Sequence, residues 1–259
     1  MIEEPYRWVE AIANRREYIE TQLAAGRPIA ALGYRDGIFF LTLGRARQKI
    51  FEIYDRIAMG AIGHPGDIER LRMAAIELAS TEGFTRSATD VSLRRLAYYS
   101  LSPVMKNAFE QVYGAPFLAR LLFAEVGAQP EDDLFLRVEY DGAIATNSQG
   151  VSPTRRGFAA LAATKAAAEL MESLLEKEHT ADADFEKTID LALNAWTIGH
   201  MAMGEDGVKE LPEPEAIAKC RQEQLGEMAV EAAILERGGK TAIRYRALSD
   251  KEVRSAIRG

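Results

Sequence analysis

Cysteine and histidine are scarce in this 259-residue chain, which contains one cysteine, Cys220, and three histidines. A single cysteine excludes an internal disulfide framework and fits a reducing compartment, so we expect a cytoplasmic protein. Scattered histidines without paired cysteines supply no zinc ligand set, and we expect no metal and no other cofactor. A thiol triad of Cys220, His200 and Asp206 would need a geometry that nearness in sequence does not provide.

Long apolar runs and an excess of positive charge are also missing. No stretch approaches the ~20 consecutive apolar residues of a membrane span, and the acidic start MIEEPYRWVE lacks the features of a signal peptide. The 39 acidic residues outnumber the 32 basic ones, which argues against a nucleic-acid partner. With 47% hydrophobic and 27% charged residues, the chain has the composition of a globular protein with a substantial core.

Short apolar runs separated by turn residues fill residues 27–72. They predict four strands, at residues 29–32, 38–43, 50–53 and 57–62. The last run is almost entirely apolar, as expected for a strand covered on both faces. The turn Gly63-His64-Pro65-Gly66 then leads into a helix that ends at Gly83.

Two further helices are predicted in the first half of the chain. An amphipathic helix is expected over residues 8–25, ended by Gly26 and preceded by a tail of residues 1–7 in which Pro5 breaks any earlier helix. After the four strands, a helix capped by Thr89 or Asp90 is expected to reach Phe109, with a kink or a restart at Pro103.

The second half of the chain repeats this order. Strands are predicted at residues 117–126, 134–140 and 143–147, with a hairpin turn at Asp141-Gly142, and helices at residues 156–178 and 184–203. A loop, a short helix at residues 214–225, strands at residues 228–235 and 241–247, and a helix from Ser249 follow. The order of strands, two helices, strands, two helices and strands predicts a single α/β domain over residues 8–259. Its expected architecture is a four-layer αββα sandwich, in which two antiparallel sheets are flanked by helix pairs.

Several strings in this order resemble α-type subunits of bacterial 20S proteasomes, which have the N-terminal-nucleophile hydrolase fold. The strings are QKIFEIYDRI at residues 48–57, AIG at 61–63, DIERLR at 67–72 and YDG at 140–142. The closing helix, residues 249–257, matches in place. The resemblance covers residues 8–257 and implies the same αββα architecture.

The resemblance implies a subunit without catalytic residues. Catalytic β-type subunits of this family use an N-terminal threonine, whose hydroxyl is activated by its own α-amine and a nearby lysine. That position falls at or next to Arg27, where Arg27-Pro28-Ile29 offers no hydroxyl, and the expected acidic partner falls on Leu43. The lysine alone remains, as Lys49, so an active peptidase of this type is not expected.

The resemblance also implies a binding pocket. In α-type subunits the matching lysine lies between neighbouring subunits and pairs with the C-terminal carboxylate of a regulatory ATPase. We therefore expect Lys49 in that pocket, with Gly26 and Gly63 as positions where a missing Cβ lets the partner's backbone approach. Lys49 could instead be a strand-edge lysine that discourages unwanted strand pairing.

The remaining roles concern assembly. The family implies a homo-heptameric outer ring that templates threonine-bearing β-type subunits, docks a ring-shaped ATPase and gates substrate entry for intracellular protein degradation. The gate would be the tail, where Pro5, Tyr6 and Arg7 stand instead of the family's Tyr-Asp-Arg. Two alternatives stay open: a self-compartmentalised hydrolase of the same fold with an unrecognised nucleophile, and a ring scaffold without a protease partner.

Overall fold

The computed structural model describes residues 5–45, 47–111, 113–146, 156–204, 206–239 and 241–258, with side chains for those from residue 8 to residue 257. Within these residues the strands form two five-stranded antiparallel sheets. The first sheet has the order β10-β9-β2-β1-β8 and consists of β1 (Ile29–Tyr34), β2 (Gly37–Gly44), β8 (Phe158–Leu161), β9 (Ala229–Glu236) and β10 (Tyr245–Leu248). The second has its strands in numerical order and consists of β3 (Ile50–Tyr54), β4 (Ile57–Gly63), β5 (Ala119–Glu125), β6 (Leu134–Val138) and β7 (Ile144–Thr146).

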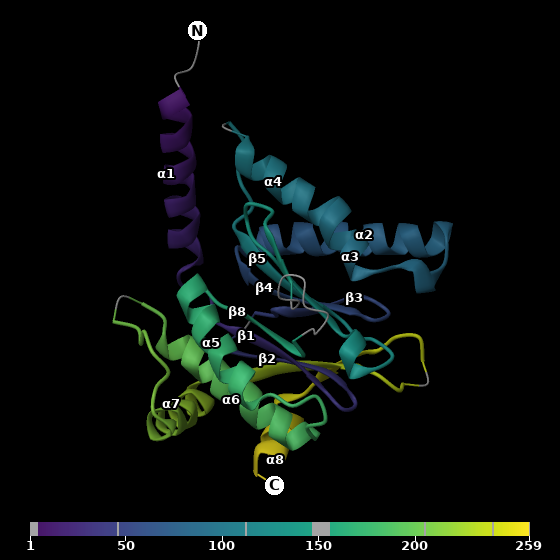
Figure 1. The fold of residues 1–259 in the computed structure, drawn as a ribbon, viewed down its shortest axis with the longest axis vertical. Helices are drawn as coiled ribbons and strands as arrows, with labels where there is room; N and C mark the ends of the chain where they lie inside the picture. The colour runs from purple at the N-terminus through teal and green to yellow at the C-terminus, as the bar shows by residue number, and fades with distance from the viewer. Residues whose placement is uncertain are drawn as a thin grey trace.

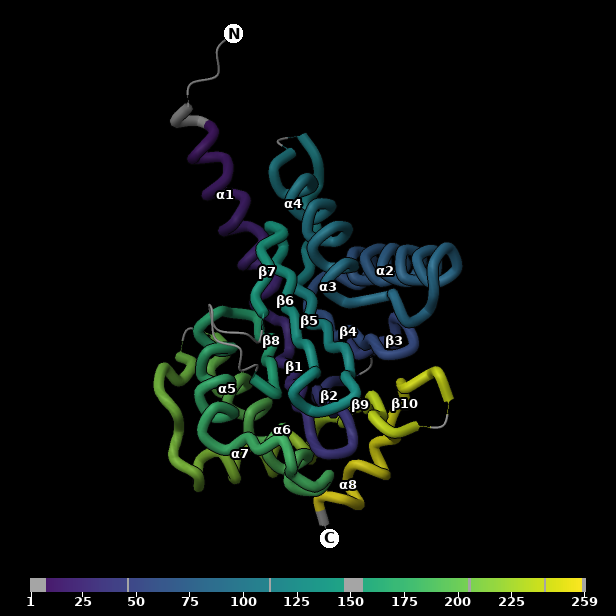
Figure 2. Tube along the Cα trace, turned by 45° about the vertical axis from the view of Figure 1, so that its right-hand side comes forward, coloured from purple at the N-terminus to yellow at the C-terminus, as the bar shows by residue number. Residues whose placement is uncertain are grey.

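Helices cover the outer face of each sheet (Figure 1). The second sheet is covered by α2 (Pro65–Thr85), α3 (Leu93–Leu96) and α4 (Ser102–Glu110). The first sheet packs against α5 (Lys165–Glu178), α6 (Phe185–Met201) and α8 (Asp250–Arg258), and α7 (Pro214–Glu227) lies against α6. The N-terminal helix α1 (Pro5–Leu23) stands apart and projects from one end of the body (Figure 2).

Strand periodicity explains the layering. Along β1, Ala30 and Leu32 face the core under α5 and α6, whereas Ile29 and Ala31 face the core between the two sheets. A further core lies between the second sheet and its helices. Each large apolar side chain that is fully buried in these cores, such as Trp196, stabilises the fold by about 1.5–3 kcal/mol. The predicted αββα sandwich is confirmed.

The predicted helix at residues 156–178 is wrong in its first third. Residues 158–161 form β8, which pairs with β1, and α5 begins only at Lys165, after Thr164 caps it by accepting a hydrogen bond from the Ala167 N–H. The alanines in the run FAAL favour a helix when only the local sequence is considered. It is fully buried at the sheet edge, and pairing with β1 outweighs the weak helical preference of two alanines.

Two helix boundaries also differ from expectation. Helix α1 begins at Pro5, so residues 5–7, expected in the tail, have a helical backbone; proline suits a first helical turn because its φ is already helical. The helix expected up to Phe109 is interrupted by a π-helical turn, Ala97–Leu101, and its cap is Ser92 rather than Thr89 or Asp90. Pro103 lies in the first turn of α4, which is the predicted restart.

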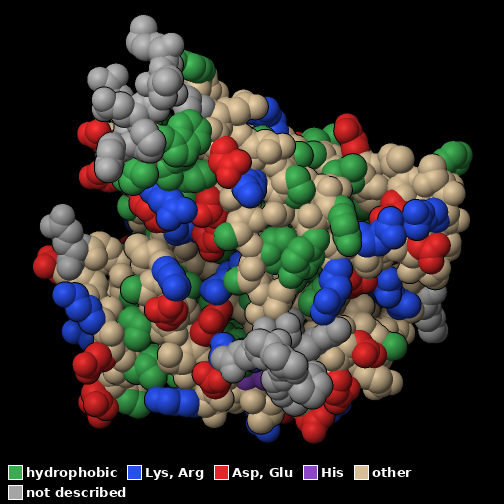
Figure 3. Space-filling model, turned by 45° about the horizontal axis from the view of Figure 1, so that its top comes forward, with side chains coloured by type: hydrophobic (Ala, Val, Ile, Leu, Met, Phe, Trp, Pro, Cys, Tyr) green, Lys and Arg blue, Asp and Glu red, His purple; other side chains and the backbone are tan. Residues whose placement is uncertain are grey.

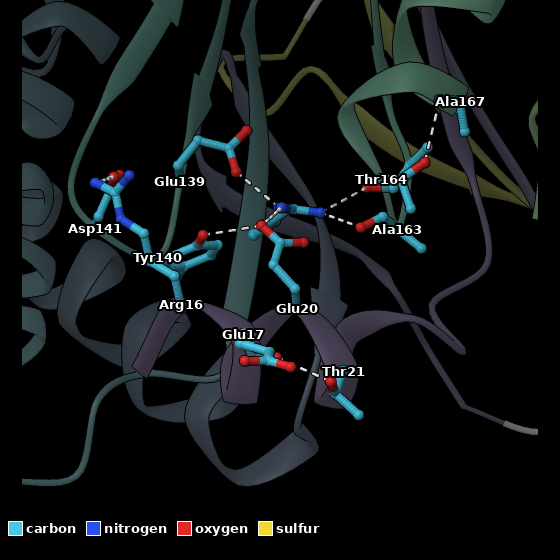
Figure 4. Close-up of polar contacts among 12 residues, drawn as sticks. Arg16, Glu17, Glu20, Thr21, Glu139, Tyr140, Asp141, Ala163, Thr164 and Ala167 are labelled. Atoms are coloured by element: carbon cyan, nitrogen blue, oxygen red, sulfur yellow. Dashed lines mark hydrogen bonds and ion pairs between the residues drawn. The ribbon is translucent and has the colours of Figure 1, made fainter. Parts of the chain in front are cut away.

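A polar network fixes the second half of α1 to the body (Figure 4). The Glu20 carboxylate accepts hydrogen bonds from Arg120 Nη2 at 2.6 Å and from the Tyr140 hydroxyl at 2.8 Å. The same Arg120 donates to Glu139 at 2.7 Å and to the Ala163 carbonyl, although its side chain is only 6% exposed. These bonds join α1 to β5, to the end of β6 and to the turn before α5, and so set the direction in which α1 leaves the body.

Across the described ranges, no helix combines the length and the apolar character that crossing a bilayer would require.

Candidate functional site

A pocket of about 490 Å³ lies at the end of the sandwich where α1 joins the body. Its wall is built from the end of α1 and the link to β1, the approach to β3, the end of β4 and the start of α2. The lining residues are Gln22, Leu23, Ala25, Gly26, Arg27, Arg47, Gln48, Lys49, Phe51, Ala61, Ile62, Gly63, Pro65, Ile68 and Glu69. The structure therefore brings the three candidate residues Lys49, Gly26 and Gly63 together in one cavity.

The backbone of Lys49 is held by both sheets. Its N–H donates to Glu231 Oε1 at 2.7 Å, and the next N–H, of Ile50, donates to the same oxygen at 2.8 Å. Its carbonyl accepts from the Ala61 N–H at 2.9 Å. Glu231 belongs to β9 and Ala61 to β4, so Lys49 is fixed where the two sheets meet.

The ammonium group of Lys49 is half-buried, and the charges that act on it are the Glu231 carboxylate and, more weakly, the Arg27 guanidinium. Its Nζ lies by the end of β2, 3.9 Å from where a Cβ on Gly44 would stand. Burial, opposed by the Glu231 carboxylate and reinforced by Arg27, lowers the pKa of Lys49 to about 8. Among the described residues no carboxylate forms an ion pair with this ammonium, which stays largely protonated at neutral pH and available to an external anion.

Both candidate glycines are close to other chain segments. A Cβ on Gly26 would collide with the Ile62 side chain, and one on Gly63 would collide with the Leu118 carbonyl oxygen. Gly63 also has φ +138°, a conformation that residues with side chains rarely adopt. Glycine at both positions therefore keeps α1, β4 and the approach to β5 close enough to form the pocket.

Arg27 also lines the pocket, although the sequence indicated it only as the place of a missing nucleophile. Its Nη1 lies 2.8 Å from Nδ1 of His200 on α6. Glu231 and His200 were not assigned to this site from sequence, because they lie 182 and 173 residues from their partners and no local spacing connects them. The bond to Arg27 also occupies the histidine of the thiol triad considered above.

Residues 27–33, all described by the structure, cover the position expected for the nucleophile of a catalytic subunit and contain no serine, threonine or cysteine. Arg27-Pro28 continues directly into β1 from the link after α1. The Thr42 hydroxyl on neighbouring β2 is buried and donates to the Pro28 carbonyl at 2.7 Å. Leu43, at the position expected for the acidic partner, is buried in the core under α6. This end of the sheet is packed as core.

The three expected gate residues, Pro5, Tyr6 and Arg7, form the first turn of α1 by their backbone, and their side chains lie outside the described part of the structure. Residues 1–4 of the expected tail lie outside it as well. Within the described ranges, no group of three His, Cys, Asp or Glu side chains is arranged to hold a metal ion.

Comparison with known proteins identifies the family to which the chain belongs. No family model matches it. It is 32% identical to the proteasome subunit alpha of Frankia casuarinae over 199 residues, which cover 73% of this chain and 75% of that protein. It is 32% identical to the proteasome subunit alpha of Streptomyces scabiei over 72% of this chain and 71% of that protein. To the subunit of Xylanimonas cellulosilytica it is 37% identical, over 52% of this chain and 56% of that protein. Identity of this level over most of both chains, with the αββα sandwich described above, shows that the chain belongs to the proteasome α-subunit family.

Proposed function

We propose that this chain is a non-catalytic α-type subunit that forms the outer ring of a proteasome core particle and docks a regulatory ATPase. The observation that carries the docking role is the pocket in which the Lys49 ammonium has no ion-pair partner among the described residues. The proposed ligand is the terminal carboxylate of the regulator's C-terminal tail.

The pocket suits such a tail in shape and in chemistry. Its volume falls within the range of about 300–1,000 Å³ that is typical of ligand pockets. Leu23, Phe51 and Ile62 supply apolar surface for side chains, and Lys49 supplies positive charge for the carboxylate. Glycine at positions 26 and 63 shapes the pocket, because a Cβ at either position would push against Ile62 or the Leu118 carbonyl.

The proposed assembly places this chain in a homo-heptameric ring stacked on threonine-bearing β-type subunits. Exposed apolar side chains on α1 support an interface there, and Figure 3 shows hydrophobic groups gathered near the free end of α1, at the upper left of the view. Trp8, Val9 and Tyr18 are 43%, 68% and 52% exposed. Large apolar side chains that are exposed together on one helix are typical of a surface that contacts a partner. Tyr99 and Val104, on the helical layer over the second sheet, are exposed too and offer surface for the stacked ring.

In this proposal residues 1–7 form the gate, which includes the first helical turn with Pro5, Tyr6 and Arg7. Residues 8–259 form a single domain that templates the β-type ring, and the complex works in the cytoplasm. The direction of α1, fixed by Glu20 and Arg120, determines where the gate segment starts.

The Lys49→Ala substitution tests the docking role. In the purified complex we expect ATPase-stimulated protein degradation to be lost, while ring assembly and unstimulated cleavage of short peptides persist. The matched control is Lys251→Ala, which removes an exposed lysine on α8, far along the chain from the pocket. Stimulation unchanged by Lys49→Ala would contradict the docking assignment.

The alternative of a self-sufficient hydrolase needs a nucleophile that processing exposes. The buried Thr42 hydroxyl, already bonded to the Pro28 carbonyl, is a poor candidate. An unprocessed N-terminus on the mature chain would exclude the processing that this alternative needs, and a co-purifying threonine-terminated subunit would exclude the scaffold alternative.

A further inference from the structure

The guanidinium group of Arg27 is a second positive charge at the pocket wall. No ion pair to Arg27 is formed by any carboxylate in the described residues, and its one side-chain hydrogen bond there is the 2.8 Å contact with His200 Nδ1. Its charge is close enough to the ammonium of Lys49 to lower the pKa of that lysine. Both cations line the same pocket, where the Glu231 carboxylate offsets part of the Lys49 charge, and a further anion between the two cations would reduce their repulsion.

Packing of α6 places His200 beside Arg27. The preceding residue, Gly199, has no Cβ, and one added there would come within 3.0 Å of the Pro28 ring. This close approach brings the end of α6 against the start of β1. The His200 ring also stacks on the fully buried Trp196, at 5.2 Å between centroids and 18° between planes. The imidazole is therefore oriented before any ligand binds.

Charge determines which way the hydrogen bond runs. Arg27 has donors only, so the neutral His200 ring must accept at Nδ1. Burial, and then the positive charge of Arg27, hold the pKa of His200 below its usual value, opposed by Glu227 at the end of α7. Glu227 is itself paired with Arg45 at 3.6 Å. His200 is thus an acceptor at neutral pH, and protonation would turn the contact into a repulsion.

We propose that Arg27 binds the terminal carboxylate of the docked tail together with Lys49, and that His200 is the positioning residue that aims the guanidinium. This inference rests on the proposed docking function. The remaining donors of the guanidinium suit a planar carboxylate, which a lysine at the same position could not match in geometry.

Binding is tested on the assembled complex with a fluorescein-labelled peptide made of the last ten residues of the ATPase that co-purifies with it. The same peptide with an amidated C-terminus serves as the reference. Arg27→Met should weaken binding of the free-acid peptide by about tenfold and leave binding of the amide little changed, because one charge-assisted contact is lost. Arg27→Lys should restore only part of the affinity.

The matched control is Arg70→Met, which removes an exposed cation on α2, next to the pocket but outside its lining. We expect less than about a twofold effect, because solvent screens an exposed charge. If Arg70→Met weakens binding as much as Arg27→Met, general electrostatic attraction explains the result and the assignment of Arg27 is wrong.

The role of His200 is tested by pH dependence and by rescue. In the unsubstituted complex, affinity for the free-acid peptide should fall on acidification as His200 becomes protonated. His200→Phe keeps the ring stack but has no acceptor, and should bind several-fold more weakly at neutral pH. His200→Gln retains an acceptor and should recover most of the affinity without the loss on acidification. An acid loss that persists in His200→Gln would overturn the positioning role.

The outcomes separate this inference from the function on which it rests. If free-acid and amidated peptides bind equally, or not at all, carboxylate docking fails and the inference fails with it. If the free acid is preferred and Lys49→Ala abolishes that preference while Arg27→Met does not alter it, docking stands and the inference alone is wrong.

Discussion

At the scale of single residues, the unusual property of this site is a lysine whose pKa lies well below the usual range. The pKa of Lys49 is lowered to about 8, so the ammonium form that a carboxylate requires predominates at pH 7 and declines above pH 8. We predict that tail affinity is nearly constant around pH 7 and falls by up to about tenfold per pH unit above pH 8. Anisotropy titrations of the labelled tail peptide between pH 7 and pH 9.5 measure this.

Lys49→Arg is the control for that pH dependence, because arginine stays protonated throughout this range. We expect the altered geometry to lower affinity for the peptide in this variant, but the affinity should not change between pH 7 and pH 9.5. The same decline in Lys49→Arg as in the unsubstituted complex would mean that another group titrates.

The sequence predicts part of this site and not the rest. Lys49 and Gly63 lie in or beside recognisable strings, and Gly26 follows the predicted N-terminal helix, so resemblance is enough to nominate them. Glu231 and His200 contact the site from the other half of the chain. Their roles depend on how β9 and α6 pack against the start of β1, which periodicity does not encode.

At the scale of elements, α1 is attached to the body by the Arg120 network, by Arg15, which donates to backbone carbonyls at and after the end of α4, and by the buried Ile19 and Leu23. We predict that Arg120→Met lowers the free energy of unfolding by about 2 kcal/mol, because the Ala163 carbonyl and the half-buried Glu20 and Glu139 lose a charged donor. It should also raise amide hydrogen exchange along α1. Chemical denaturation and hydrogen exchange with mass spectrometry measure these two effects.

The control is Arg16→Met on the same helix, α1. It breaks a more exposed ion pair, between Arg16 and Asp141. That pair should contribute less than about 1 kcal/mol. Equal losses in the two variants would show that the buried network has no special role.

The end of β4 is predicted to be intolerant of any side chain at position 63. With φ +138° and the Leu118 carbonyl in the place of a Cβ, Gly63→Ala should destabilise the fold by about 2 kcal/mol and distort the pocket. Thermal unfolding and tail binding are the measurements. The control is Gly238→Ala, where an added Cβ meets no atom within 4 Å, and it should change neither the melting temperature nor the tail affinity. The same melting temperature and tail affinity in Gly63→Ala as in Gly238→Ala would contradict this account.

Elements were predictable where periodicity is long and local signals agree. The strands β1 to β4 and the helix α6, with its Asp184 cap, are found close to their expected positions. The strand β8 is not predicted from the sequence, because a run of four apolar residues at a sheet edge is too short to have a periodicity of its own. Its conformation is decided by pairing with β1, more than a hundred residues earlier.

At the scale of the whole molecule, the order of strands and helices was enough to predict the sandwich, because few architectures bury two sheets and two helical layers in that order. Assembly into a ring could not be predicted in the same way. Ring formation depends on the fit between surfaces of separate copies, such as the exposed apolar residues of α1, and a pattern within one chain does not determine that fit.

The central claim is that this chain is the non-catalytic partner in a threonine-dependent protease. The most direct measurement is native and intact-protein mass spectrometry of the complex that a tagged copy of the chain recovers from its own cells. We predict an unprocessed copy of this chain at equal stoichiometry with a second subunit trimmed to an N-terminal threonine. Recovery of this chain alone, or with its own N-terminus cut back to a nucleophile, would contradict the account.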